Sequence, residues 1–103
     1  MVGQPTMRVR TVFLAPGTTS LASAMSGMQK ADLIVAGEPR EWEAVPYALD
    51  TWSAERGKGL IAIGRVVSEL ASTQSCAAWL LSIFPEMPVN SIHVEDPYWS
   101  VNA

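Results

Sequence analysis

Two hydrophobic runs, each followed directly by a glycine and charged residues, constrain this chain more than any other feature. The first is residues 33–36 (Leu-Ile-Val-Ala) ahead of Gly37, and the second is residues 60–63 (Leu-Ile-Ala-Ile) ahead of Gly64. A buried strand that ends at glycine and continues into a charged helix start is typical of sites at the strand carboxyl ends of α/β proteins. Glycine permits a tight exit, and a helix N-terminus offers free N–H groups and the positive end of a dipole. We expect both runs to open onto the same edge of one sheet.

Strand and helix signals alternate along the whole chain, which predicts an α/β fold. β-branched and apolar runs predict strands over residues 9–14, 31–36, 60–63 and 89–94. Apolar residues at helical spacing predict a helix in each interval between them, the third over 67–84. The order β-α-β-α-β-α-β implies a mostly parallel four-stranded sheet flanked by helices. We expect a single α/β domain over residues 1–103, with 1–8 as a loose lead-in.

Local signals leave some element boundaries open. Pro16-Gly17 is expected to end the first strand, and Thr18, Thr19 or Ser20 to cap the helix that follows, because a hydroxyl accepts an orphan backbone N–H. Pro46 removes an N–H and clashes with the preceding turn, so the second helix has either a late start or a kink there.

Composition and charge exclude several classes of function. Hydrophobic residues make up 49% of the chain and charged residues 17%, which is typical of a globular protein. The net charge is −3 and no basic run is present, which argues against nucleic acid and anionic membranes as partners. Cys76 is the only cysteine, which excludes an internal disulfide and fits a cytoplasmic protein.

The shared edge of the sheet carries the candidate ligand pocket. Its expected members are Gly37, Glu38, Arg40, Gly64, Arg65 and Ser68. Arg65 and Glu69 are four residues apart and share a helix face. They form either a site pair, with Arg65 binding an anion and Glu69 acting as acid, base or ligand, or an exposed ion pair worth under about 1 kcal/mol. The carboxylates over 38–43 either complement the helix dipole or hold a divalent cation. Arg40 lies among them and would compete with such a cation for the carboxylates.

The remaining reactive and aromatic side chains favour structural roles. His93, the only histidine, cannot form a metal site alone, and Cys76 has no histidine nearby to activate it as a nucleophile. Core-like helical spacing predicts buried positions for Trp42, Val45, Leu49, Trp52, Cys76 and Trp79.

Three segments carry a resemblance that covers most of the chain. Residues 31–38 (Ala-Asp-Leu-Ile-Val-Ala-Gly-Glu) resemble a strand ending in Thr-Gly-Asp/Glu, and residues 64–69 (Gly-Arg-Val-Val-Ser-Glu) a Gly-His-x-x-Ser-Glu motif. Residues 88–99, ending in Asp-Pro-Tyr-Trp, resemble a closing strand and a Pro-Phe-type tail. Together they look like the C-terminal half of the Nif-three-like dinuclear metal centre family, the GTP cyclohydrolase one type two homologues. Residues 9–14 would be the strand that opens this half.

In that family, the His and Glu of the second motif help to hold two metal ions. Glu69 matches this glutamate and is the one metal ligand that the resemblance implies. Arg65 stands in place of the histidine and remains protonated, so it cannot ligate a metal. Its guanidinium could take the place of the cation and pair with Glu69. A divalent metal is therefore implied by the resemblance alone, and no cofactor is expected.

The leading hypothesis is a non-catalytic binding or oligomerisation module with a degenerate metal site, forming homo-oligomers and accepting a small anionic ligand at the pocket. One alternative is a metal-dependent hydrolase of a nucleotide or other small molecule, its ligands completed by a partner chain, because such sites need several converging His, Asp or Glu. Another is a purely structural fragment, which a bound anion near Arg65 would contradict. The candidate contacts between copies are Met25, Met28, Tyr98 and Trp99.

Overall fold

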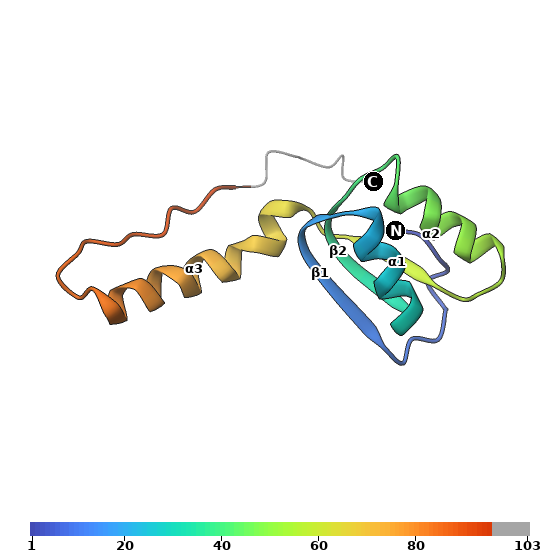
Figure 1. The fold of residues 1–103 in the computed structure, drawn as a ribbon, viewed down its shortest axis with the longest axis horizontal. Coiled ribbons are helices and arrows are strands. Elements are labelled where there is room, and N and C mark those ends of the chain that lie inside the picture. The colour runs from blue at the N-terminus through green and yellow to red at the C-terminus, as the bar shows by residue number, and fades with distance from the viewer. Residues whose placement is uncertain (96–103) are drawn as a thin grey trace.

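Three strands and three helices alternate along the chain in a computed structural model that describes residues 1–95 (Figure 1). They are β1 (Val12–Thr19), α1 (Leu21–Lys30), β2 (Leu33–Pro39), α2 (Ala44–Ser53), β3 (Gly59–Ala62) and α3 (Arg65–Ile83). The strands form a parallel sheet in the order β1-β2-β3. The α/β class and the parallel sheet were therefore predicted correctly. The expected roles of Asp96, Pro97, Tyr98 and Trp99 lie outside the described residues.

The starts of the first two helices settle the boundaries that the sequence left open. Ser20 caps α1, because its Oγ accepts a hydrogen bond from the Ser23 backbone N–H at 3.3 Å. α2 starts late, at Ala44, which places Pro46 in the first turn of the helix. The N–H groups of that turn have no partner within a helix, so the proline costs no hydrogen bond there.

β1 differs from its prediction because it continues through Pro16-Gly17 to Thr19. The pairing of β1 with β2 shifts register between Ala15 and Thr18, so a bulge absorbs the two residues that were expected to end the strand. Gly17 has φ of 70°, a left-handed conformation that glycine adopts without steric cost. The strand is thereby extended to the edge where β2 ends.

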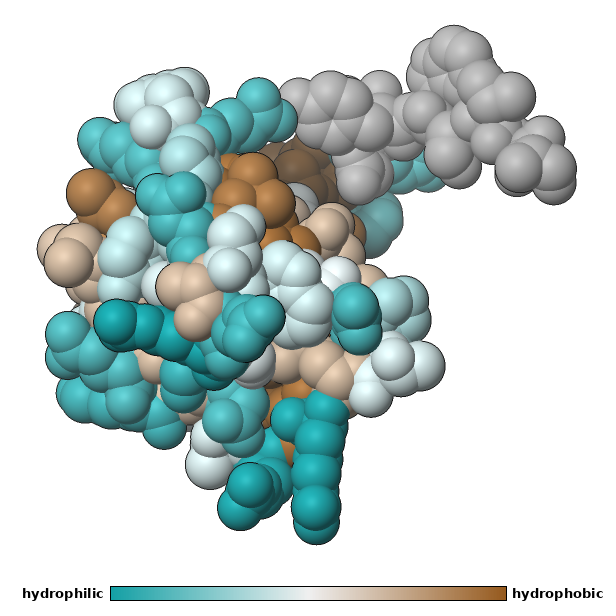
Figure 2. All heavy atoms as spheres, turned by 90° about the vertical axis from the view of Figure 1, so that its right-hand side faces the viewer, coloured by the Kyte–Doolittle hydropathy of each residue, from teal (hydrophilic) through white to brown (hydrophobic). Residues whose placement is uncertain are grey.

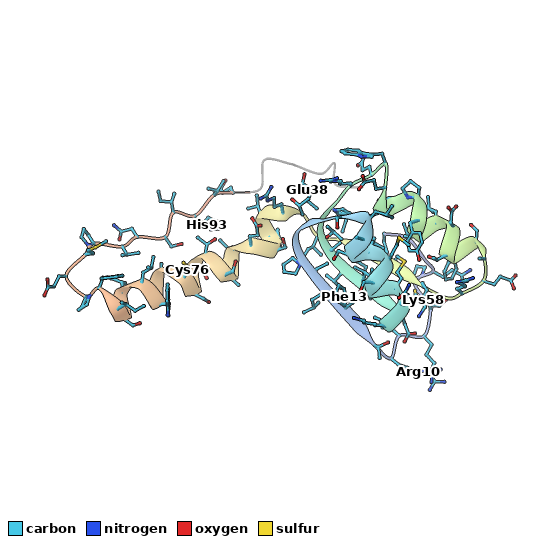
Figure 3. The ribbon with its side chains drawn as sticks, in the orientation of Figure 1. Arg10, Phe13, Glu38, Lys58, Cys76 and His93 are labelled. Atoms are coloured by element: carbon cyan, nitrogen blue, oxygen red, sulfur yellow. The ribbon has the colours of Figure 1, made fainter. Side chains whose placement is uncertain are left out.

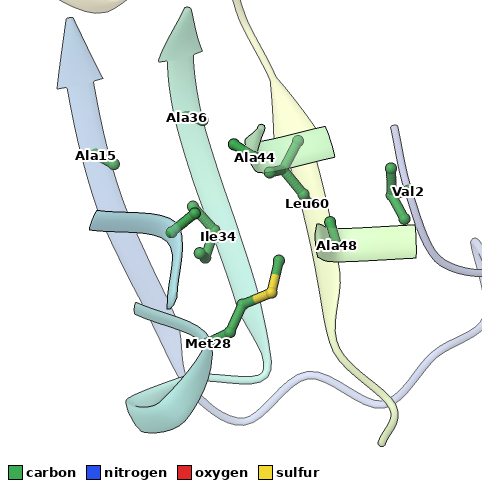
Figure 4. Packing of buried hydrophobic residues seen from close by; sticks show 9 residues of the cluster. Val2, Ala15, Met28, Ile34, Ala36, Ala44, Ala48 and Leu60 are labelled. Carbon is green, nitrogen blue, oxygen red and sulfur yellow. The ribbon is translucent and has the colours of Figure 1, made fainter. Parts of the chain in front are cut away.

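The hydrophobic core lies between one face of the sheet and helices α1 and α2 (Figure 4). Alternate strand residues point into it, and Ile34 and Leu60 are its largest fully buried side chains. The helices contribute mainly small residues, namely Ala24, Ala44 and Ala48, with Met28 filling the remaining space. Small side chains let both helices lie close to the sheet.

Several residues expected in this core are exposed. Trp42 is 75% and Leu49 48% exposed, whereas Val45 and Trp52 do pack against the core. Trp42 precedes α2, because the helix starts at Ala44, and helical spacing therefore does not apply to it. The lead-in is less loose than expected, because Val2 is buried and pairs with Leu60 through an antiparallel bridge.

Within residues 1–95 no helix covers the second face of the sheet, and only the lead-in lies against it, beside Leu33 and Ile61. Its side chains are Val12 and Leu14 of β1, Leu33 and Val35 of β2 and Ile61 of β3. Leu14, Val35 and Ile61 form one row across the three strands. Leu14 is 69% and Val12 51% exposed, and the other three are half-buried. Residues 60–63 are therefore not buried on both faces of the sheet, and Val12, Leu14, Val35 and Ile61 are left without a covering helix. We call these four residues the open face.

Helix α3 explains why the open face is uncovered. It touches β1 and β2 and then runs away from the sheet, and none of its residues is buried (Figure 1). Cys76 and Trp79, expected in a core, are exposed. Residues 89–94, expected to form a fourth strand, pair with no strand and run back beside α3. Because α3 leads away from the sheet, the segment that follows it does not reach a strand edge. We call residues 65–95 the arm.

At the other end of the sheet, Asp32 joins the beginnings of the strands. Its Oδ2 accepts hydrogen bonds from the backbone N–H groups of Arg10 and Thr11, at 3.0 and 3.1 Å, and from the Thr11 hydroxyl. Lys58 lies 3.9 Å from its Oδ1, and Figure 3 shows Arg10 and Lys58 at this end. These donors, foremost the Arg10 N–H, lower the pKa of Asp32.

Candidate functional site

The ends of β2 and β3 meet at the carboxyl edge of the sheet, as their sequences predicted. The Ile63 N–H donates to the Ala36 carbonyl and the Gly64 N–H to the Gly37 carbonyl, both at 2.9 Å. Gly64 has φ of 87°, which turns the chain from β3 directly into α3. The first turn of α3 is thereby placed across the ends of the neighbouring strands.

Ser68 fastens this first turn to the bulge in β1. Its Oγ accepts a hydrogen bond from the Gly17 N–H at 3.0 Å and donates one to the Arg65 carbonyl at 2.8 Å. Gly37 lies against both groups, and a Cβ at that position would come within 2.5 Å of the Gly17 carbonyl oxygen and into contact with the Ser68 Oγ. Three backbone segments therefore pack at this point with no room for a side chain on Gly37.

Arg65 lies between two carboxylates that come from different elements. Its Nε is 3.3 Å from Glu69 Oε2, four residues along α3, and its Nη1 is 4.0 Å from Glu38 Oε2 at the end of β2. The expected pairing of Arg65 with Glu69 is present, and Glu38 joins it across the strand boundary. Figure 3 shows Glu38 at the base of the arm. We call Gly17, Glu38, Arg65, Ser68 and Glu69 the edge cluster.

The ion pairs of the edge cluster are exposed to water. The side chains of Arg65, Glu38 and Glu69 are 57%, 59% and 44% exposed, so each pair is worth at most about 1 kcal/mol. Two carboxylates and one guanidinium give the cluster a net charge of −1. This charge, together with the engagement of Arg65 by carboxylates, makes the cluster unsuited to binding an anion.

Arg40 lies apart from Arg65 in the candidate pocket. Its Nη1 is 3.4 Å from Glu43 Oε2, a contact three residues along the chain. A depression of about 350 Å³ adjoins it, lined by Thr18, Glu38, Pro39, Arg40, Glu41 and Trp42. The structure thus divides the expected pocket in two, with Glu38 bordering both the edge cluster and this depression.

The edge cluster does not fit a divalent metal ion as it stands. Glu38 and Glu69 are hard oxygen ligands, but both approach the permanently charged Arg65, which occupies the position of a cation between them. Within residues 1–95, three or more His, Cys, Asp or Glu side chains are nowhere gathered in the way a metal site needs. In the same part of the chain, no helix combines the length and apolar character required to cross a bilayer.

Other candidate residues are spread over the molecule. Cys76 and His93 lie on the arm, away from the edge cluster (Figure 3). Met28 is buried in the core, which removes it as a contact between copies, whereas Met25 is 38% exposed. The residue that the sequence analysis missed is Gly17. Its sequence signal is the Pro16-Gly17 pair after the expected first strand, and in the structure its N–H donates to Ser68 in the first turn of α3.

Comparison with known proteins identifies no relative of this chain. No family model, no curated protein and no solved structure matches the chain.

Proposed function

We propose that this chain is a non-catalytic oligomerisation module, a Nif-three-like half-domain in which an arginine has replaced the metal centre. The observation that carries the proposal is the position of Arg65 between Glu38 and Glu69. In the family that the sequence resembles, a histidine at this position helps to hold metal. Here the guanidinium supplies the positive charge that the two carboxylates require.

In this proposal the edge cluster does not catalyse a reaction but holds α3 against the sheet. The contact of Ser68 with Gly17 and the ion pairs of Arg65 connect α3 to β1 and β2. They set the direction in which the arm leaves the sheet. In this proposal the arm provides the surface through which the chain contacts other copies.

The test is to restore the histidine and measure metal binding. Arg65→His places an imidazole beside Glu38 and Glu69, and we expect the variant to bind Zn²⁺ at least about tenfold more tightly than the wild-type chain. Binding is measured by competition with a chromogenic zinc indicator. Arg65→Gln is the matched control, because it removes the positive charge without adding a metal ligand.

Two outcomes would contradict the proposal. One is that the wild-type chain binds Zn²⁺ or Mn²⁺ as tightly as Arg65→His does. The other is that the wild-type chain, with either metal added, releases phosphate from nucleoside triphosphates. Either result would favour the metal-dependent hydrolase, with ligands completed by a partner chain.

A further inference from the structure

Among residues 1–95, two apolar surfaces are left largely uncovered, the open face and the arm. A parallel sheet ordinarily has both faces covered, because crossover helices pack on each side. Here α1 and α2 cover one face, while Leu14 and Val12 on the other are more than half exposed. On the arm the exposed large apolar side chains are Val67, Trp79, Leu81, Ile83, Phe84, Met87, Ile92 and Val94.

Most of the arm and the central row of the open face lack the charges that keep an exposed surface solvated. Between Glu69 and Glu86 the sequence has no Asp, Glu, Lys or Arg, and this stretch forms most of α3. The row of Leu14, Val35 and Ile61 is equally uncharged. By contrast, polar side chains predominate at the end of the molecule opposite the arm (Figure 2). The absence of charge from both surfaces is typical of surfaces buried in an interface.

The arm lacks a packed interior of its own. The return segment lies beside α3 with a hollow of about 460 Å³ between them, lined by residues that include Cys76, Leu80 and Val89. A second hollow of about 220 Å³ lies nearer the sheet, beside Leu70 and Ile92. Both hollows are open to solvent, so the apolar side chains that line them lack packing partners on one side.

The arm does not cover the open face of its own chain. The first turn of α3 is held across the strand ends by Ser68 and Arg65, and from there α3 leads away from the sheet (Figure 1). Ile63 is still hydrogen-bonded to β2, and α3 starts at Arg65, so Gly64 alone connects the sheet to the helix. An arm held in this direction does not lie against the open face of its own chain.

We propose that two copies of this chain exchange arms, each arm packing against the open face of the other copy. This inference rests on the proposed function for the fixed direction of α3. Each chain carries both halves of the interface, so a two-fold dimer leaves neither surface uncovered. The side chain best suited to anchor the arm is Trp79, because it is large, 60% exposed and central to the uncharged stretch.

A lipid surface fits the arm less well than a second copy does. Helices that lie in a membrane interface carry Lys or Arg on their polar face. The polar residues of α3 beyond Glu69 are Ser72, Thr73, Gln74, Ser75 and Ser82. A lipid bound to the arm would also leave the open face uncovered.

The test compares matched pairs of substitutions by light scattering on the full chain. The wild-type protein is expected at twice the 11.1 kDa of one chain. Leu14→Glu on the open face and Trp79→Glu on the arm each bury a charge in the interface and should raise the dimer dissociation constant at least about 100-fold. Leu49→Glu and Trp42→Glu, at exposed positions outside both surfaces, should leave the mass unchanged. Circular dichroism establishes that each variant is folded.

Mixing the two interface variants tests the exchange itself. A Leu14→Glu chain retains an intact arm and a Trp79→Glu chain an intact open face, so their mixture forms one complete contact. We expect the mixture to contain more dimer than either variant alone.

A monomeric wild-type chain would overturn the inference, as would a dimer that both variants leave intact or a mixture no more dimeric than its components. Binding of the monomer to phosphatidylcholine vesicles would assign the arm to lipid. The zinc measurement on Arg65→His stands apart from the dimer mass, so the two proposals can fail separately.

Discussion

At the scale of single residues, Asp32 makes the clearest link between a side chain and the stability of the sheet. Its carboxylate accepts three hydrogen bonds at the beginning of β1 and faces Lys58, and these contacts lower its pKa. A carboxyl whose folded pKa lies below the unfolded value of about 3.9 adds stability above that value. The contribution is lost as the pH falls through the folded pKa.

Asp32→Asn should therefore be less stable than the wild type at neutral pH and lose less stability on acidification. Urea unfolding midpoints between about pH 7 and pH 3 measure both effects. Asp50→Asn, at an exposed position on α2, is the control and should follow the wild-type curve. Parallel curves for Asp32→Asn and the wild type would mean that Asp32 has the same pKa in the folded and unfolded chain.

Residue spacing predicted the contact within α3 in the edge cluster but not the contact between α3 and β1. Arg65 and Glu69 are four apart in α3, and helix geometry alone brings them together. The bond between Gly17 and Ser68 joins residues 51 apart, and it depends on a bulge that extends β1 past a Pro-Gly pair. Such a bulge has no simple sequence signature, because the same two residues also end strands.

At the scale of the secondary-structure element, α1 depends on its N-terminal cap. The Ser20 hydroxyl satisfies the Ser23 N–H, and the first turn of α1 contains no acidic residue to compensate for its loss. Ser20→Ala should lower the free energy of unfolding by about 1 kcal/mol. Ser53→Ala, at the exposed last residue of α2, should change it by less than about 0.5 kcal/mol. Chemical denaturation measures both, and equal effects would mean that Ser20 does not act as a cap.

Periodicity predicted the existence of every helix but not what α3 packs against. The apolar spacing in residues 67–84 is real, and it was assigned to a core because most such faces in a single domain lie in one. A periodic pattern identifies an apolar face without showing which surface, if any, covers it. The fourth strand failed for the same reason, because residues 89–94 have the composition of a strand but follow a helix that leads away from the sheet.

At the scale of the whole molecule, the chain is more extended than a compact domain of its length. Its radius of gyration is 16.8 Å, whereas a compact domain of about 100 residues has a value near 13 Å. The excess arises from the arm, which adds length without adding buried residues. The apolar composition that predicted one well-covered sheet is thus divided between a half-covered sheet and an exposed helix.

This division predicts unequal local stability along the chain, which amide hydrogen exchange can measure. Amides of β2, the central strand, should exchange most slowly because they open only with the core. A helix with no buried residue has little stability of its own, so amides of α3 should exchange rapidly in dilute solution. If the arm is covered by a second copy, raising the protein concentration should slow exchange in α3 far more than in β2, because α3 amides open locally when the arm is uncovered, whereas β2 amides open only with the core. Exchange in α3 that is as slow as in β2 at every dilution would instead mean that the helix is stable alone, and that its uncharged surface tolerates water.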